Sequence, residues 1–329
     1  MKLQFKKTSE EARKAMCQAA VNIDHASQRG FEEIKLAQDQ ISKFTNHDHV
    51  KIVNSGNSAI LGIMSAFKGR IMIPDQGGWI GFKNIAEFLG LKTTEVQTRL
   101  GILDPEIVAN AIDNYNPEAL FITSFAGYIA EQPVKELYEV CIDSGVFLVE
   151  DASGGIGDRK NHVGNGEHAH VIVASTGSPK IVNVGNGGFI STNQDEIFKR
   201  NKTILKILKA DPITCSGISV EIKNAPSILS KTITACDFVK KEFKSAIYPD
   251  KRGITVAIKT DEPWKLGYLL RKRLNIEGRS MITVCPRYER VMADAVCLEI
   301  KNLDISCLEN DHLSRIIQIT IEEMDNVSI

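Results

Sequence analysis

The stretch from Gly145 to Thr192 decides the fold. It begins GVFLVEDASGGIGD, from Gly145 to Asp158, and after a polar loop it continues HVIVASTGSPKIVNVGNGGFIST, from His170 to Thr192. Short apolar runs rich in β-branched residues and bounded by polar residues are typical of buried parallel strands. VFLV and VIVA are two such runs. The stretch therefore predicts neighbouring strands of an α/β sheet.

Polar residues follow both predicted strands directly. Glu150 and Asp151 follow the first strand, and Ser175 and Thr176 follow the second. In an open α/β sheet, ligands bind outside the carboxyl ends of the strands. Lys180 comes next, on a loop marked by glycine and proline. We therefore expect a carboxylate, a hydroxyl and an amine at one edge of the sheet.

These three groups suit pyridoxal 5'-phosphate (PLP) better than other common cofactors. A lysine amine forms a Schiff base with its aldehyde, a carboxylate keeps its pyridine nitrogen protonated, and hydroxyls bind its phosphate. The alternative is that Asp151 caps a helix and Lys180 is a surface lysine. For either residue alone, that simpler interpretation is favoured.

Five motifs resemble those of the DegT-type sugar aminotransferases, a branch of the aspartate aminotransferase superfamily of fold-type I PLP enzymes. In chain order they are V-N-S-G-N-S-A-I from Val53, I-P-D-Q-G-G-W from Ile73, E-D-A-S-G-G-I-G from Glu150, S-x-x-x-x-K from Ser175, and V-G-N-G-G after the lysine. Their order and spacing are close to those of the family from about residue 30 to residue 200. The resemblance implies a PLP-dependent transferase.

The resemblance also implies the residues of a cofactor site. A glycine-containing turn that opens a helix presents backbone N–H groups to an anion, as a phosphate loop must. Trp79 occupies the family's position for a ring stacked on the pyridine, although a lone Trp is more often part of a core. The expected cofactor contacts are Ser55, Gly56, Asn57, Ser58, Trp79, Asp151, Ser153, Ser175 and Lys180.

Strand-like and helix-like segments alternate along the chain, which predicts a mostly parallel sheet in a three-layer α/β domain. Candidate strands lie near residues 50, 70, 93, 119, 146, 171 and 188. Seven strands match the large domain of fold-type I PLP transferases. We expect an N-terminal helical segment over residues 1–30, the PLP-binding domain over 31–200, and a small C-terminal α+β domain over 201–329.

Helices are predicted at both ends of the large domain. Residues 8–43 read as one or two amphipathic helices, with Thr8 or Ser9 as the cap and Gly30 as a break. After Ile197, the segments KRNKTILKILKA and SILSKTITACDFVKKEFKSA predict long charged helices, the longer of which would act as a hinge.

The sequence departs from the family pattern in three places. The family's G-x-N-x-R-M motif, whose asparagine reaches the phosphate in the neighbouring subunit, is G-I-S-V-E-I at 217–222, which leaves Ser219 as the candidate donor to a partner. Gly154 replaces a glutamine, and Asn57 replaces a common threonine. We therefore expect a divergent member of the family that still forms a homodimer.

Two arginines are candidates for substrate binding. Arg287 and Arg290 follow the predicted strand 281–285. A guanidinium grips a carboxylate with two parallel hydrogen bonds, as in amino-acid-acting members of the superfamily. The alternative is that both are surface charges, which is the commoner state of arginine.

Composition bounds the function further. The chain has 329 residues, of which 43% are hydrophobic and 25% charged, and its net charge is -1. These values are typical of a globular protein and predict no nucleic-acid or membrane binding, so we expect a cytoplasmic protein. The seven cysteines are dispersed, as reduced thiols are. The histidine pairs at 47/49 and 168/170 have no further ligand at metal spacing, so we expect solvated histidines and no metal.

The leading hypothesis is an aminotransferase. Lys180 would hold PLP as an internal aldimine and then move the substrate's proton, while Asp151 keeps the pyridine nitrogen charged. The substrate would be an amino acid or an amino/keto sugar. A PLP-dependent lyase or synthase acting on an amino acid shares all these residues. A protein acting on aminoacyl-tRNA, or a non-catalytic relative, is the remaining alternative.

Overall fold

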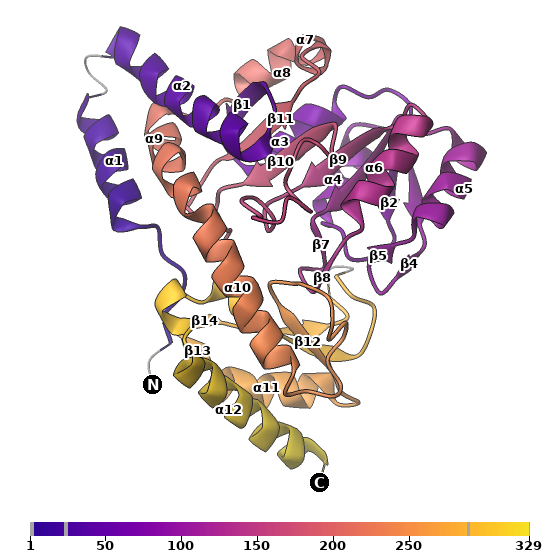
Figure 1. Cartoon of the computed structure of the whole chain (residues 1–329), viewed down its shortest axis with the longest axis vertical. Helices are drawn as coiled ribbons and strands as arrows, with labels where there is room; N and C mark the ends of the chain where they lie inside the picture. Colours follow the sequence, from indigo (N-terminus) through magenta and orange to yellow (C-terminus); the bar gives the residue numbers. More distant parts are fainter. Residues whose placement is uncertain (1–2, 23–25, 288–289, 329) are drawn as a thin grey trace.

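The computed structural model describes residues 3–22, 26–287 and 290–328. A seven-stranded sheet organises the first two thirds of the chain (Figure 1). Its strands are β1 (His49–Val53), β2 (Arg70–Pro74), β3 (Lys92–Val96), β6 (Ala119–Thr123), β9 (Phe147–Asp151), β10 (Val171–Ser175) and β11 (Gly188–Thr192). All seven strands predicted from the sequence are present.

The strand order is β1-β11-β10-β9-β6-β2-β3. Neighbouring strands are parallel from β10 to β3, and β11 runs antiparallel to both β10 and β1. The carboxyl ends of β9 and β10 therefore lie side by side. This confirms the mostly parallel sheet and places Asp151, opposite Val173, and Ser175 at the same edge of the sheet.

Helices cover both faces of the sheet and form the outer two of three layers. Successive side chains of β6 pack on opposite faces of the sheet. Leu120 and Ile122 lie in the hydrophobic core on one face, and Ala119 and Phe121 lie in the core on the other. The helices on the first face are α2 (Ala26–Thr45), α5 (Pro105–Tyr115), α6 (Val134–Asp143) and α9 (Pro212–Glu221). Those on the second face are α3 (Gly56–Met64), α4 (Gly81–Phe88), α7 (Glu196–Arg200) and α8 (Lys202–Ile207).

Two helix predictions need correction. Helix α1 (Glu10–Val21) begins at the predicted cap, with Ser9 Oγ accepting a hydrogen bond from Ala12 N, but Gly30 lies inside α2 and does not break it. The segment KRNKTILKILKA is not one long helix. Asn201 separates α7 from α8, because its buried side-chain amide donates to the Gly62 carbonyl at 2.6 Å.

The small domain is built on a three-stranded antiparallel sheet. Its strands are β12 (Val256–Lys259), β16 (Ala295–Leu298) and β15 (Ile282–Cys285), in that order. Its helices are α10 (Ala225–Lys240), α11 (Pro263–Arg273) and α12 (Asn310–Ser328). The N-terminal segment packs on this domain, where Phe5 forms an isolated β-bridge with Leu303 and Leu3 lies in the hydrophobic core.

Short elements complete the chain. The two-residue strands are β4 (Thr98–Arg99), β5 (Ile102–Leu103), β7 (Phe125–Ala126), β8 (Ala130–Glu131), β13 (Asn275–Ile276) and β14 (Arg279–Ser280). The 3-10 turns are η2 (Ile222–Asn224), η3 (Ile300–Asn302) and η4 (Ile305–Cys307). Within the described residues, no helix has the length and apolar composition that crossing a bilayer requires.

Helix α10 connects the two parts of the molecule, as Figure 1 shows. Its first half, with Leu229 and Ile233, packs into a core of the large sheet, and its second half, with Cys236 and Val239, packs into the core of the small domain. Helix α9, which follows the boundary predicted at residue 200, also packs into the large-sheet core.

Polar contacts hold the small domain to the large sheet just before β12. The Arg252 guanidinium contacts Asp158 with two hydrogen bonds of 2.8 Å and also pairs with Glu131. The carbonyl of Tyr128 accepts hydrogen bonds from Ile254 N at 2.9 Å and Thr255 N at 3.0 Å. These contacts fix the position of Tyr128 relative to both domains.

Candidate active site

The loop before α3 forms a close-fitting cradle against the end of β10. Ser55 caps the helix, with its Oγ accepting from Ser58 N at 3.1 Å and lying 2.8 Å from Ser58 Oγ. Gly56 packs on Ser175 so tightly that a Cβ atom there would lie 2.5 Å from Ser175 Cβ. The start of α3 therefore directs its backbone N–H groups and hydroxyls to the edge where Ser175 stands, which suits an anion.

Asp151 lies at the end of β9 in a hydrogen-bonded chain. Its Oδ1 accepts from Ser153 N at 2.9 Å and from Ser153 Oγ at 2.5 Å, and Ser153 Oγ in turn accepts from Ser175 N at 2.8 Å. Burial raises the pKa of Asp151, while the charge of Lys180 and the bonds from Ser153 oppose that rise. The structure thus brings Asp151, Ser153, Ser175 and Lys180 together.

Lys180 directs its amine at a tyrosine that the sequence did not single out. Lys180 Nζ donates to the hydroxyl of Tyr128 at 2.6 Å. Burial by itself lowers the pKa of Lys180, but attraction to Tyr128 and Asp151, with the hydrogen bond, outweighs burial and raises it. The amine is therefore favoured as a cation by the hydroxyl that it contacts and by the attraction of a carboxylate.

Tyr128 sits among further charges. Its backbone φ of 65° is in the left-handed region that non-glycine residues seldom occupy. The centre of its ring lies 5.2 Å from the Arg290 guanidinium carbon and 4.8 Å from Lys301 Nζ. Glu299 pairs with both cations. Tyr128, Glu299 and Lys301 were not predicted as site residues.

Trp79 is a surface residue at the edge of this site. Its side chain is 39% exposed, so it does not belong to the core. Its indole Nε1 donates to Asn57 Oδ1 at 3.0 Å, which joins Trp79 to the loop before α3. Stacking of Trp79 on a pyridine ring stays a prediction.

The two candidate substrate arginines differ in environment. Arg287 is exposed on the loop after β15. The Arg290 side chain is only 13% exposed, pairs with Glu299, and donates through Nε to the Gly127 carbonyl at 2.7 Å. The Arg290 guanidinium is therefore not a surface charge, and its hydrogen-bond donors already have partners within the protein. Substrate binding by either arginine stays a prediction.

Ser219 cannot be the donor to a partner subunit that we expected. It lies in α9, is 2% exposed, and donates from Oγ to the Ser216 carbonyl at 2.8 Å. Glu221 is also buried, and it accepts from Ser9 Oγ at 2.5 Å. The family's motif is replaced here by a helix that packs on α1 and α2, so these polar residues face the interior.

Two of the four histidines expected to be solvated are in fact packed against the sheet. His47 is 1% exposed, with Nδ1 lying 3.0 Å from Ser191 Oγ and Nε2 lying 3.1 Å from the Ala169 carbonyl. His170 Nδ1 accepts from Leu148 N at 2.9 Å. Both rings complete hydrogen bonds at strand ends.

Among the described residues, Glu131, Asp158 and His162 form a cluster with metal-ligand chemistry. Arg252 pairs with both of its carboxylates. These charges are satisfied by the protein, so the cluster is part of the contact between the two domains.

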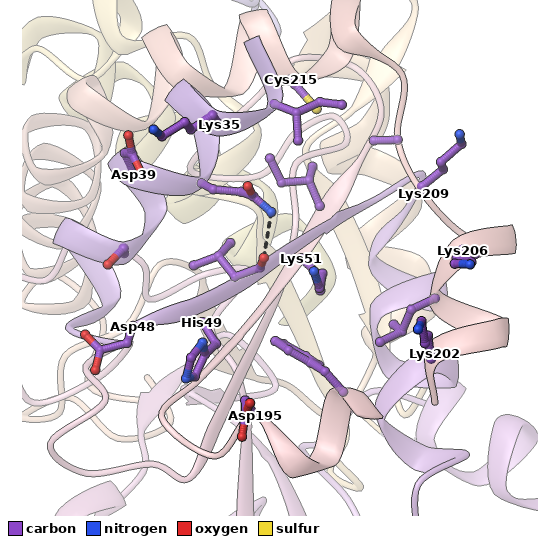
Figure 2. A pocket seen from close by; sticks show the side chains of 18 of the residues that line it. Lys35, Asp39, Asp48, His49, Lys51, Asp195, Lys202, Lys206, Lys209 and Cys215 are labelled. Atoms are coloured by element: carbon purple, nitrogen blue, oxygen red, sulfur yellow. Dashed lines mark hydrogen bonds between the residues drawn. The ribbon is translucent and has the colours of Figure 1, made fainter. Parts of the chain in front are cut away.

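A separate groove lies along the β1 edge of the sheet. It has a volume of about 920 Å³ between α2 and α8, and none of the expected cofactor residues line it. Figure 2 shows Lys35 and Asp39 on the side of α2, and Lys202 and Lys206 on the side of α8. The groove is distinct from the Lys180 site.

The Lys180 site fits PLP. A cradle closed by Gly56 and Ser175 suits the phosphate, the buried carboxylate of Asp151 suits a protonated pyridine nitrogen, and the Lys180 amine lies within Coulombic range of Asp151. With its three-layer fold and strand order, the chain has the architecture of a fold-type I PLP-dependent transferase.

The chain belongs to the DegT/DnrJ/EryC1/StrS aminotransferase family, which its sequence matches over residues 7–209. Residues 226–321 match the MJ1341 family C-terminal domain. The first match confirms the resemblance inferred from the motifs, and the enzyme class it implied. No curated protein matches the chain in sequence.

Solved structures agree with the fold. The aminotransferase PseC of Helicobacter pylori, involved in the biosynthesis of pseudoaminic acid, is 14% identical, with a TM-score of 0.78 over 99% of this chain and 100% of that one. A DegT DnrJ EryC1 StrS aminotransferase from Brucella abortus is 14% identical, with a TM-score of 0.75 over 98% and 99%. NtdA from Bacillus subtilis, solved with bound cofactor PMP, is 13% identical, with a TM-score of 0.74 over 98% and 85%.

Proposed function

We propose that this protein is a PLP-dependent aminotransferase whose cofactor is carried by Lys180. The observation that carries the proposal is the convergence of Lys180, Asp151 and the Ser55–Ser58 cradle at the carboxyl ends of three strands. Bound there, PLP supplies an aldehyde that takes up the amine of a substrate and a ring that withdraws electrons from the carbon next to it.

Each residue has a definite task in this proposal. The loop before α3 and Ser175 bind the phosphate through N–H and O–H groups. Ser153 orients the Asp151 carboxylate, which receives the protonated ring nitrogen. Lys180 would hold the cofactor through its amine, and that amine is also the base that would move a proton from the substrate carbon. Tyr128, 2.6 Å from the Lys180 amine, directs that amine and exchanges a proton with it.

The substrate is an amino compound, either an amino acid or an amino/keto sugar. The similar aminotransferases named above support an amino-group transfer, and NtdA, solved with bound PMP, supports a cofactor of this type. We propose that the protein acts in the cytoplasm as a homodimer, because enzymes of the superfamily complete each site with residues of a second subunit.

Borohydride reduction of the purified protein with PLP tests this function directly. We expect the cofactor to become fixed to the peptide that contains Lys180, and a shift of cofactor absorbance when an amino donor is added. Lys180→Arg should abolish the labelling, while Lys202→Arg, on the surface of α8, should label like the wild type. Labelling of another lysine would overturn the assignment. A cofactor that binds at Lys180 but transfers no amine to any keto acceptor would favour a lyase or synthase.

A further inference from the structure

The groove along the β1 edge of the sheet is rich in lysine (Figure 2). Its volume of about 920 Å³ is within the range of small-molecule sites. Residues of β1 line it, together with residues of α2 on one side and of α7 and α8 on the other. Six lysines are among them, namely Lys35, Lys51, Lys199, Lys202, Lys206 and Lys209. The proposed function gives this concentration of positive charge no task.

Three of these lysines lie toward the α8 side of the groove. Successive residues of a strand alternate between its two faces, so Lys51 shares a face with Val53, which packs in the same core as α7 and α8. Lys51 Nζ lies 5.9 Å from the centre of the Phe198 ring of α7. Lys209 forms a β-bridge with Val53, and Lys206 is in the last turn of α8. We call Lys51, Lys206 and Lys209 the groove lysines.

The groove lysines have no acidic partner among the residues that the structure describes. Lys199, by contrast, pairs with Asp195 at 3.1 Å and with Glu196 at 2.6 Å. The other two acids that line the groove are Asp39 and Asp48, and Figure 2 shows them on the side away from α8. The α8 side of the groove therefore carries positive charge without a counterion, which attracts anions.

Helix α8 places this charge in the groove at a cost to itself. Lys202 and Lys206 are one helical turn apart, and like charges at this spacing destabilise a helix. The next residue, Ile207, is 72% exposed to solvent. Helix α8 thus directs a lysine to the groove and an isoleucine to water, an arrangement that the stability of the helix does not explain. An anion in the groove would relieve the repulsion between the two lysines.

The outer edge of β1 does not favour a peptide as the occupant of the groove. Gln38 Nε2 donates to the Val50 carbonyl at 2.8 Å, and Ala210 N donates to the Ile52 carbonyl at 3.2 Å. A peptide that extends a sheet needs the free carbonyls of the edge strand. Because these two carbonyls already have donors, an acidic peptide would gain little by pairing with β1.

The side chains of the lining favour phosphate groups. The described lining contains no arginine, tyrosine or tryptophan, and its phenylalanine, Phe198, is 7% exposed. Stacking of nucleic-acid bases needs exposed aromatic rings or guanidinium groups, which this groove lacks. Ammonium groups on flexible stems act as point charges, and this is how lysines bind phosphate. The groove therefore suits a ligand with several phosphates and does not suit a nucleic-acid strand.

We propose that the groove lysines bind a small molecule that carries a chain of phosphate groups, either a nucleoside triphosphate or an inorganic polyphosphate. Linked phosphates carry several negative charges in a row and can contact the three lysines together, which a single carboxylate cannot do. The site is separate from the phosphate cradle at Ser55–Ser58, because none of those residues lines the groove. Binding in the groove does not depend on the aminotransferase function.

Calorimetric titration with tripolyphosphate tests this site. The protein is first loaded with PLP, reduced with borohydride and dialysed, so that the cradle is occupied. ATP, adenosine and triglutamate are the comparison ligands, and we expect tripolyphosphate and ATP to bind and adenosine not to bind. The double variant Lys51→Met/Lys206→Met should weaken tripolyphosphate binding by about tenfold or more. Lys92→Met, at an exposed lysine of the opposite edge strand β3, should leave it unchanged.

The comparison of ATP with tripolyphosphate distinguishes the two sources of phosphate. Equal affinities would support a site that binds the phosphate chain alone, and tighter binding of ATP would support a site that also contacts the nucleoside. Acetylation of the wild type gives a second measurement that needs no variant. Bound tripolyphosphate should protect Lys51 and Lys206 from acetylation and should not protect Lys92.

Four results would overturn the proposal. They are a double variant that binds tripolyphosphate like the wild type, triglutamate binding as tight as that of tripolyphosphate, acetylation of Lys51 and Lys206 that tripolyphosphate does not change, and loss of wild-type binding at about 150 mM salt. The titrations are repeated without PLP. A protein that takes up no PLP at Lys180 but binds tripolyphosphate would refute the proposed function and support the groove site.

Discussion

The amine of Lys180 lies 2.6 Å from the hydroxyl of Tyr128, although 52 residues separate them in the chain. The small domain fixes this contact, because Ile254 and Thr255 bind the Tyr128 carbonyl through their backbone N–H groups. Lys180 belongs to the large sheet. The reactive amine is thus oriented by a tyrosine that both domains hold in place.

Tyr128→Phe should move the pH dependence of PLP uptake to lower pH. Attraction to Tyr128, with the hydrogen bond that Lys180 donates to its hydroxyl, raises the pKa of Lys180 against the effect of burial, and only the neutral amine attacks an aldehyde. Removing the hydroxyl lowers that pKa, so more neutral amine is present at any given pH. Stopped-flow absorbance measured from pH 7 to pH 10 follows the uptake.

Tyr138→Phe is the matched control for this experiment, because Tyr138 packs on His170 away from the site. It should leave the uptake profile unchanged. A Tyr128→Phe profile that coincides with the wild type would show that the hydroxyl does not control Lys180.

Glu150→Gln should stabilise the protein above pH 7 and have little effect near pH 4. Burial raises the pKa of Glu150 to about 7, even though Ser124 Oγ and Gly164 N donate to Oε1. A carboxyl with a pKa raised on folding contributes its full stability below its unfolded pKa of about 4.3, and that contribution is lost as the pH rises to 7. The free energy of unfolding that Glu150 contributes falls by about 3 kcal/mol over this pH range.

Urea unfolding at pH 4 and pH 8 measures this difference. The control is Glu139, an exposed residue of α6 that pairs with Lys135. Glu139→Gln should change the free energy of unfolding by less than about 0.5 kcal/mol at both pH values. An equal effect of Glu150→Gln at the two pH values would mean that Glu150 does not titrate in this range.

Gly56→Ala should damage the phosphate cradle. The added Cβ would lie 2.5 Å from Ser175 Cβ, so the start of α3 must move away from β10. Overpacking of this kind costs about 1–3 kcal/mol. We expect the displaced loop to pass this cost on to phosphate binding, which would lower the affinity for PLP by roughly 5- to 150-fold. Ser65→Ala, at the other end of α3, should leave PLP affinity unchanged. Fluorescence titration with PLP measures both variants, and equal affinity for Gly56→Ala would show that the close approach is unnecessary.

We also expect a homodimer, which sedimentation at micromolar concentration would detect. Asn57 and Trp79 are exposed at the rim of the candidate site, where a second subunit could cover them. Ser219 is excluded as the contact because it is buried. A monomer that binds PLP tightly would show that this chain completes its site alone.

Much of the fold could be predicted because its signals are local. Most strands of the large sheet are short apolar runs next to a turn or a polar residue, and their alternation with helices indicates a mostly parallel sheet. The break between α7 and α8 could not be predicted. It depends on Asn201 reaching the Gly62 carbonyl, a contact between distant residues.

The candidate site was predicted only in part. Asp151, Ser175 and Lys180 come from adjacent strand ends of one sheet, whereas Tyr128 and Lys301 meet Lys180 through the packing of the small domain. One signal could have found Glu299. It directly follows the buried strand Ala295–Leu298, much as the acids at 150 and 151 are the last residues of β9.

The salt bridge of Arg252 has a kinetic consequence. Arg252 binds Asp158 with both arms of its guanidinium and also pairs with Glu131, so the two domains are joined beside the site by buried charges. Separating the two domains would break this ion pair and leave its charges without partners, which costs several kcal/mol. We therefore expect the two domains to stay joined while a substrate enters, so that its association follows the viscosity of the solvent and shows no slower phase of domain opening.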